Sequence, residues 1–184
     1  MLYTCISILF SLSFSTANAG KVNERNWKEH PEIMEIRRLK KRVQDGQTLP
    51  GWSLASKSVD WCEENGVSKK EKLTDNNGVI RKYKTEGAQG TTAFWTESIY
   101  GPKGTLRWLF VRIFQMDSEI AGEYKIFFDS TGSQVWKLYK HTTEGKPTKD
   151  TPLSTDWFIK NPSMEWEAAS TCPQMNGKPA AGTP

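Results

Sequence analysis

Residues 106–114 read Leu-Arg-Trp-Leu-Phe-Val-Arg-Ile-Phe, and this stretch decides the predicted fold. Successive side chains of a β-strand point to opposite faces of the sheet. One face would carry Leu106, Trp108, Phe110, Arg112 and Phe114. The other would carry Arg107, Leu109, Val111, Ile113 and Gln115. Because both sets are largely apolar, we expect a central strand that is covered on both sides.

The alternation of apolar and polar residues continues beyond this strand. It marks two further strands, at residues 124–128 and 135–139, and then weakens. Residues 141–152 are rich in Thr, Lys, Gly and Pro and are predicted to form a loop. Residues 157–159 and 164–166 are predicted to be short strands or aromatic anchors that pack on the sheet.

Three similar segments connect the predicted strands. Each ends one strand, makes a four-residue polar turn closed by glycine and starts the next; they are residues 73–80, 99–106 and 127–134. Glycine adopts the positive φ that such turns need, and Asp75 and Asp129 can accept hydrogen bonds from the turn's own amides. Three hairpins in series predict an antiparallel meander. A calcium loop would need several more acidic oxygens, so we expect no metal site.

A helix is predicted before the strands, over about Pro31–Asp45. Proline suits the first helical turn, and Gly46 is a natural residue for the C-terminal end. Four apolar residues recur at steps of three and four along it: Ile33, Ile36, Leu39 and Val43. The basic run over residues 37–42 could bind nucleic acid or an anionic surface. We favour a solvated helix face whose cations stabilise the C-terminal end of the helix dipole.

The predicted fold class is α+β, with one N-terminal helix packed on a curved antiparallel β-meander of about six to eight strands. Residues 20–172 would form this single domain, and residues 173–184, which contain no aromatic residue, would be disordered. Aromatic residues make up 11% of the chain, which argues against global disorder. The net charge of +4 is mild and both signs are mixed, so we expect no nucleic-acid partner. We also expect a monomer.

Residues 1–19 are predicted to be a signal peptide. They contain no charged residue, and their apolar run is too short to span a bilayer. Ala17 and Ala19 supply the small residues that signal peptidase needs before Gly20. No Lys or Arg precedes the apolar run, so the signal is atypical or the true start lies upstream. The alternative is a buried N-terminal segment of a cytosolic protein. Export would leave a mature protein that is periplasmic or secreted, without a transmembrane span.

Cleavage after residue 19 would remove Cys5 and leave two cysteines, Cys62 and Cys172. An even number of cysteines in an oxidising compartment predicts one disulfide between them. Because this disulfide would close the long loop between residues 62 and 172, it would stabilise the fold by about 4–5 kcal/mol in the chain-entropy model. Two free thiols are the alternative.

The turns and the helix together resemble known bacterial proteins. The strand–turn–strand repeats look like the Tyr-Asp-x-x-Gly hairpin repeats of many bacterial surface proteins. The order of helix, cysteine-bearing strand and hairpins over residues 27–139 is similar to uncharacterised secreted bacterial proteins. That resemblance implies an exported fold and carries no catalytic residues. The first turn departs from the pattern, because Thr74 stands where the others have Tyr100 and Phe128.

Few residue patterns point to an enzyme. The sequence has no Gly-x-Ser-x-Gly elbow, no phosphate-binding Gly-Lys-Ser/Thr loop and no His-Glu-x-x-His. Its two histidines, His30 and His141, stand far apart, so neither a His-rich metal site nor a cofactor site is expected. Glu63 and Glu64 are adjacent and would point to opposite faces of a strand rather than act as a carboxylate pair.

The candidate binding residues combine aromatic rings with cations; they are Arg81, Tyr83, Arg107, Trp108, Arg112 and Trp136. Such a sheet face can bind sugars by stacking, bind acidic polymers, or receive another protein. The alternative is that most of these rings belong to the core. Arg112 would then pair with an acid such as Glu97 or Glu123, because an unpaired charge among aromatic residues is costly.

We therefore expect an exported, non-enzymatic envelope protein that binds a protein partner or an envelope polymer through one sheet face. A hydrolase acting on cell-wall material is the alternative from a different class, and a structural surface component is a third reading. A cleft with two converging titratable groups would favour the hydrolase, whereas self-association would favour the surface component.

The export hypothesis predicts the mass of the mature protein. Purified from its native host, it should begin at Gly20 and have a mass two hydrogens below that of the reduced chain, because Cys62 and Cys172 are joined. Intact-mass spectrometry with and without a reductant measures both features. A protein that begins before Gly20 and retains Cys5 would contradict the hypothesis.

Overall fold

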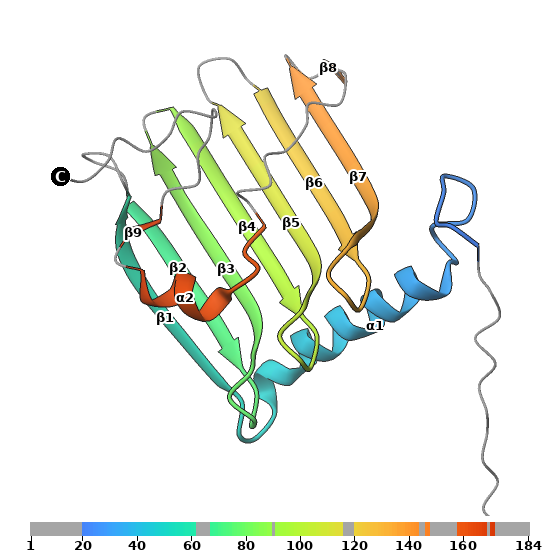
Figure 1. Cartoon of the computed structure of the whole chain (residues 1–184). Coiled ribbons are helices and arrows are strands. Elements are labelled where there is room, and N and C mark those ends of the chain that lie inside the picture. The colour runs from blue at the N-terminus through green and yellow to red at the C-terminus, as the bar shows by residue number, and fades with distance from the viewer. Residues whose placement is uncertain are drawn as a thin grey trace, which may run out of the picture.

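The computed structural model describes residues 20–61, 67–89, 91–115, 120–143, 146–147, 158–168 and 170–171. Within these ranges the chain forms a nine-stranded sheet with the order β8-β7-β6-β5-β4-β3-β2-β1-β9 (Figure 1). Strands β1–β7 follow one another as antiparallel neighbours. This arrangement confirms the predicted α+β meander.

The strands have similar lengths, apart from two short ones at the edges. The seven meander strands are β1 (Ser53–Trp61), β2 (Val67–Thr74), β3 (Ile80–Gln89), β4 (Thr92–Tyr100), β5 (Leu106–Gln115), β6 (Ile120–Phe128) and β7 (Gln134–Thr143). β8 (Lys146–Pro147) extends the β7 edge, and β9 (Ser170–Thr171) pairs in parallel with β1 at the opposite edge. β7 reaches Thr143 and β8 follows at residues 146–147, so the prediction of a loop over residues 141–152 was wrong for these residues.

Helix α1 (Pro31–Asp45) has the predicted bounds and precedes a 3₁₀ turn, η1 (Gly46–Thr48). The His30 ring caps its start, because Nδ1 accepts a hydrogen bond from the Glu32 amide at 3.3 Å. Gly46 ends the helix with ordinary helical dihedrals. Glycine is needed at this position because it has no side chain: a Cβ there would lie 2.6 Å from the Trp52 ring and would clash with it. Neither α1 nor α2 (Pro162–Glu167), the helices of the described part of the chain, is long and apolar enough to cross a membrane.

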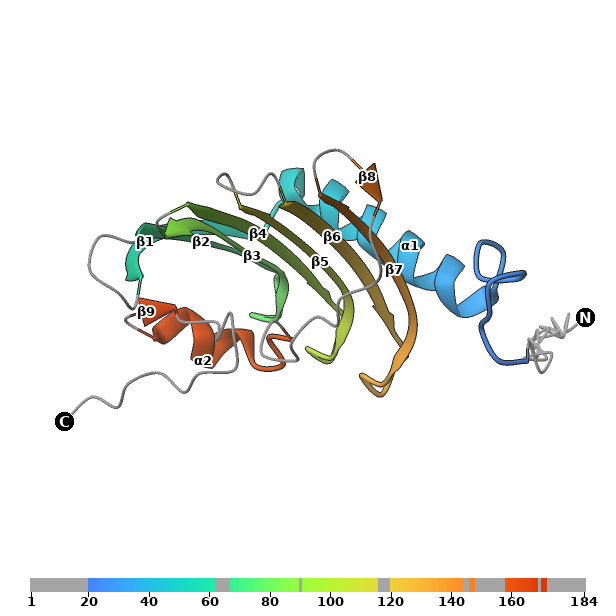
Figure 2. The same ribbon diagram turned by 90° about the horizontal axis from the view of Figure 1, so that it is seen from above.

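The sheet is curved, and the two helices lie on opposite faces of it (Figure 2). α1 packs on the convex face, near the end of the sheet that carries the three hairpin turns (Figure 1). α2 lies on the concave face. Residues 164–166, predicted to be a strand or an anchor, belong to α2, and Trp166 packs against the core there. The strand alternative was therefore wrong and the anchor alternative is confirmed.

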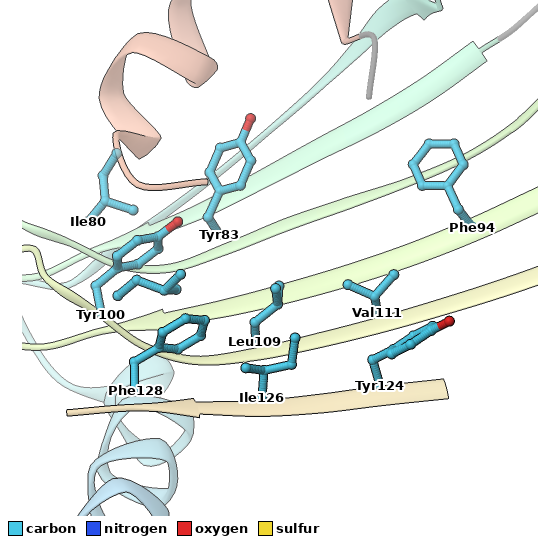
Figure 3. Close-up of a cluster of buried hydrophobic side chains, with 10 residues drawn as sticks. Ile80, Tyr83, Phe94, Tyr100, Leu109, Val111, Tyr124, Ile126 and Phe128 are labelled. Atoms are coloured by element: carbon cyan, nitrogen blue, oxygen red, sulfur yellow. The ribbon is translucent and has the colours of Figure 1, made fainter. Parts of the chain in front are cut away.

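Each face of the sheet has its own hydrophobic cluster. Figure 3 shows the concave cluster; it contains Ile80, Tyr83, Phe94, Tyr100, Leu106, Leu109, Val111, Tyr124, Ile126 and Phe128. The cluster beneath α1 contains Ile33, Ile36, Val43, Leu73, Ile99, Trp108 and Phe127. β5 lies inside the sheet, between β4 and β6, and contributes to both clusters. The prediction that it is covered on both sides is confirmed.

The start of β5 departs from the predicted alternation because it contains a β-bulge. Ile99 pairs with Trp108 and Tyr100 pairs with Leu106, so Arg107 is an extra residue with no partner of its own in the ladder. Consequently Leu106 joins the concave cluster, and Arg107 reaches α1 on the convex side. The expected assignment of these two residues to faces was wrong.

The bulge recurs in all three repeats. Arg81, Arg107 and Val135 are the extra residues, each three positions after the turn glycine. Gly78, Gly104 and Gly132 have φ values of 76°, 77° and 88°, which confirms the reason for glycine at these turns.

The two aspartates in these turns behave as predicted. The Asp75 carboxylate accepts bonds from the Asn77 and Val79 amides at 3.0 Å. Asp129 accepts bonds in the same way from Thr131 and Ser133. Burial raises the pKa of Asp75, but the Arg81 guanidinium at 3.0 Å and these amides lower it on balance. The pKa of Asp129 is lowered first by the Thr131 hydroxyl and further by the amides. The aspartates therefore serve the turns themselves.

The two bulge arginines tie neighbouring hairpins together. Arg81 Nε donates to the Tyr100 carbonyl oxygen at 3.1 Å, and Arg107 Nε donates to the Phe128 carbonyl oxygen at 3.1 Å. Each acceptor is the last strand residue before the next turn. Arg107 also binds Glu32 at 2.9 Å and Glu35 at 3.3 Å, so it joins the hairpins to α1. We call Arg81 and Arg107 the arginine staples.

Several predicted features fall outside the described residues. They are the signal peptide (residues 1–19), Cys5, Cys62, Cys172, the Glu63–Glu64 pair, and the tail over residues 173–184.

The staples predict a stability difference between two arginine variants. Arg107→Met should lower the free energy of unfolding by about 2–3 kcal/mol, because the Phe128 carbonyl and Glu32 lose a buried partner. Arg38→Met, which changes an exposed arginine of α1, should change it by less than about 0.5 kcal/mol. Urea unfolding followed by fluorescence measures both. Equal stability of the two variants would show that the staples contribute nothing.

Candidate functional site

The six candidate binding residues do not form one surface. Arg81 and Arg107 are the arginine staples, buried at the turn end of the sheet. Tyr83 lies on the concave face and is fully buried. Only Trp108, Trp136 and Arg112 remain together on the convex side. The aromatic–cationic set is therefore divided between core, turn scaffold and convex surface.

Tyr83 is part of the packing beneath α2. Its ring meets the Trp166 ring edge-on, with centroids 6.5 Å apart. Burial raises the pKa of the Tyr83 hydroxyl well above its ordinary range. A ligand could not reach this side chain without displacing the helix.

Three lysines hold α2 against the concave face. Lys70, whose side chain is fully buried, donates to the carbonyl oxygens of Glu165 at 2.7 Å and Ala168 at 3.3 Å. Lys57 donates to the Trp166 carbonyl, and the Lys57 and Lys72 amines lie over the Trp166 ring. The last carbonyls of a helix lack partners within the helix and attract cations. These lysines are thus explained by α2, although burial lowers the pKa of Lys70.

Arg112 lies on the convex side of β5, with half of its side chain exposed (50%). Its guanidinium binds Glu123 of β6, which is its cross-strand neighbour. It also lies over the Phe110 ring, 5.7 Å from the centroid. Of the two acids proposed for it, Glu123 is the partner.

A groove of about 290 Å³ opens between α1 and the convex face of the sheet; its lining residues are Trp27, Ile36, Arg37, Lys40, Trp108, Lys125, Phe127 and Leu138. We call it the α1 groove. The buried Ile36 and Phe127 and the partly exposed Leu138 form its apolar wall, and three side chains are cationic. None of the lining residues is acidic.

Helix and strand periodicities bring these residues together. Ile36 belongs to the buried stripe of α1, and Lys40 follows it one helical turn later, on the same side. Lys125 and Phe127 lie two residues apart on β6 and so share one face, and Phe127 pairs with Trp108 of β5. The basic run of α1 is predicted from its sequence to be a solvated face. That holds for the exposed Arg38, Lys41 and Arg42, but Lys40 is half-buried.

The groove was missed for two reasons. Arg37, Lys40, Lys125 and Trp27 were not among the predicted site residues. For Lys40 the signal was present, because a residue four positions after Ile36 borders the apolar stripe. For Lys125 it was not, since the position of β6 beneath α1 depends on packing between distant segments.

The aromatic rings of the groove hold its cations. Lys40 Nζ lies 3.4 Å from the centroid of the Trp108 ring, and Arg37 Cζ lies 5.1 Å from that of Trp27. Trp27 also stacks on Trp136, with centroids 6.1 Å apart and planes at 17°. Each cation–ring contact is worth about 0.5–2 kcal/mol, depending on exposure. These indoles therefore position cations and do not offer bare faces to a sugar.

The cations of the groove are incompletely neutralised. Burial lowers the pKa of Lys40, and the positive charge of Lys125 lowers it further. Glu97 opposes both effects. A lowered lysine pKa means that the charged form is disfavoured, so an anion bound beside Lys40 would relieve this penalty.

Comparisons of the chain with protein-family models, with curated proteins and with solved structures found no match. The resemblance to secreted bacterial repeat proteins thus stays a prediction.

The repulsion between Lys125 and Lys40 predicts a measurable pKa change. Lys125→Gln should raise the pKa of Lys40, because it removes a positive neighbour that disfavours the ammonium form. NMR titration of the lysine side chains measures this pKa. Lys103→Gln, at an exposed turn lysine, is the matched control and should leave it unchanged. An identical Lys40 titration in both variants would place Lys125 too far away to matter.

Proposed function

We propose that this chain is an exported, non-enzymatic envelope protein that holds a negatively charged group of a polymer or protein partner in the α1 groove. One observation carries the proposal: the groove is lined by three cations, two indoles and apolar side chains, without an acid. Export rests on the composition of residues 1–19 and the small residues before Gly20.

Electrostatics favours an anion at this position. Lys40 is half-buried, so its charge is less screened by salt than that of an exposed lysine. Lys40 and Lys125 repel each other, and an anion between them replaces this repulsion by two attractions. The Lys40 ammonium also keeps its hydrogens available, because contact with a ring face uses none of them in a hydrogen bond to an oxygen.

A neutral sugar held only in the groove fits less well. Sugars stack on open aromatic faces, whereas Arg37 and Trp136 flank the Trp27 ring and Lys40 lies against Trp108. The hydrolase alternative also gains no support here, because the lining offers no carboxylate to act as a general acid or nucleophile.

The proposal predicts a site-specific loss of anion binding. Lys40→Gln with Lys125→Gln should weaken binding of dextran sulfate about tenfold or more, because two charge-assisted contacts are lost. Quenching of tryptophan fluorescence is a suitable signal, since Trp27 and Trp108 line the groove.

The matched control carries the same change in net charge elsewhere. Lys103→Gln with Lys160→Gln alters two exposed lysines outside the groove and should change the affinity less than about twofold. An equal loss in both double variants would mean that only net charge matters, and the groove would then have no special role.

A further inference from the structure

We infer that the ligand is an acidic polysaccharide, a linear chain of sugars with repeating negative charges, which extends from the α1 groove across the open part of the convex face. This inference rests on the proposed function of the groove and adds the ligand class and the path of the chain. Four features support it: a cross-strand row that carries Lys84 and Lys125, an exposed tryptophan beside this row, the contacts of the neighbouring acids, and the apolar lining of the groove.

The lysines extend beyond the groove along neighbouring strands. Lys84 of β3 pairs with Glu97 of β4, Glu97 pairs with Phe110 of β5, and Phe110 pairs with Lys125 of β6. These four residues form one cross-strand row. Three steps of about 4.8 Å separate its ends by about 14 Å. This is too far for one carboxylate or phosphate to bridge, but a chain of repeating anions can contact both lysines.

The row continues to Glu71, the cross-strand neighbour of Lys84 on β2, so its charges alternate in sign. Only together with Lys82 do the cations outnumber the two acids, Glu71 and Glu97. Lys82 lies next to this row on β3, and burial and the charge of Lys84 lower its pKa. Glu97 raises the pKa of Lys82 as well as that of Lys40, so one carboxylate partly compensates several cations. Glu71, the cross-strand neighbour of Lys84, also opposes the lowering at Lys82, and it is itself bound by Lys69 at 2.8 Å.

Trp95 supplies the surface that selects a sugar. It lies on the convex face of β4, two residues from Glu97, and is 40% exposed. Its cross-strand neighbours are Glu86 and Arg112, and Arg112 is bound to Glu123. Trp95 is the fourth residue of β4, nearer to Thr92 than to Tyr100, and α1 crosses the sheet near its opposite end, beside the three hairpin turns (Figure 1). An exposed indole beside a row of cations suits a sugar ring that carries an acidic group.

The small apolar surface of the groove points the same way. Ile36 and Phe127 are already buried, but Leu138 is partly exposed; it would remain wet against an inorganic phosphate chain, whereas the C–H groups of a sugar can contact it. Polyphosphate satisfies only the lysines. A polyglutamate peptide supplies charge but no ring for Trp95. The observations therefore favour an acidic polysaccharide over both.

Oligogalacturonates of defined length test the inference in the intact mature protein. The hexamer should bind at least about tenfold more tightly than galacturonic acid itself, because it reaches from Lys125 to Lys84. Trp95→Ala should weaken hexamer binding about tenfold and leave binding of the monomer unchanged. Lys84→Gln should weaken only the hexamer, and Lys103→Gln is its control. Isothermal titration calorimetry measures all affinities, and unchanged melting temperatures verify folding.

The contrary outcomes distinguish the two proposals. Equal affinities for monomer and hexamer, with no effect of Trp95→Ala, would overturn the extended site while leaving the groove intact. Polyphosphate or polyglutamate binding as tightly as the hexamer would overturn the sugar class. Failure of every anion, including dextran sulfate, to bind would overturn the proposed function itself.

Discussion

The ion pairs of Arg107 with Glu32 and Glu35 are the contact on which the rest of the structure depends. A β-bulge turns this arginine out of the strand alternation, and its guanidinium then joins a hairpin turn to the first turns of α1. The same contacts neutralise two acids of α1. Because the start of the helix is fixed, the distance between its later turns and the convex face of the sheet is fixed as well. The α1 groove is the space left beneath those turns.

The two faces of the sheet have different roles for a related reason. On the concave face, α2 lies against the sheet, and three lysines there are used in holding it. On the convex face, α1 covers only the turn end, and the strands beyond it carry mixed charges and one exposed indole. The ligand-accessible chemistry is therefore on the face whose helix leaves part of the sheet open.

The architecture could be predicted from sequence because its signals are local. Apolar alternation located β5, the turn glycines located the hairpins, and residues 31–45 showed a clear helical stripe. The bulges could not be predicted, since an extra residue such as Arg107 shows only when the pairing of two strands is known. The site was predicted poorly for the same reason. Trp108 and Tyr83 are both aromatic residues of strands, and the sequence does not show which face of the sheet each occupies. Trp108 lies beneath α1, whereas Tyr83 lies beneath α2.

The third repeat ends the series of staples, because Val135 occupies the position of Arg81 and Arg107. Each of these arginines acts forward, on the hairpin that follows it in the chain. A hairpin inserted by tandem duplication of residues 106–133 would bring its own arginine and its own acceptor carbonyl. The sheet could thus widen by whole hairpins during evolution, with Val135 always marking the last one. Such widening would lengthen the convex face without altering the chemistry of the groove.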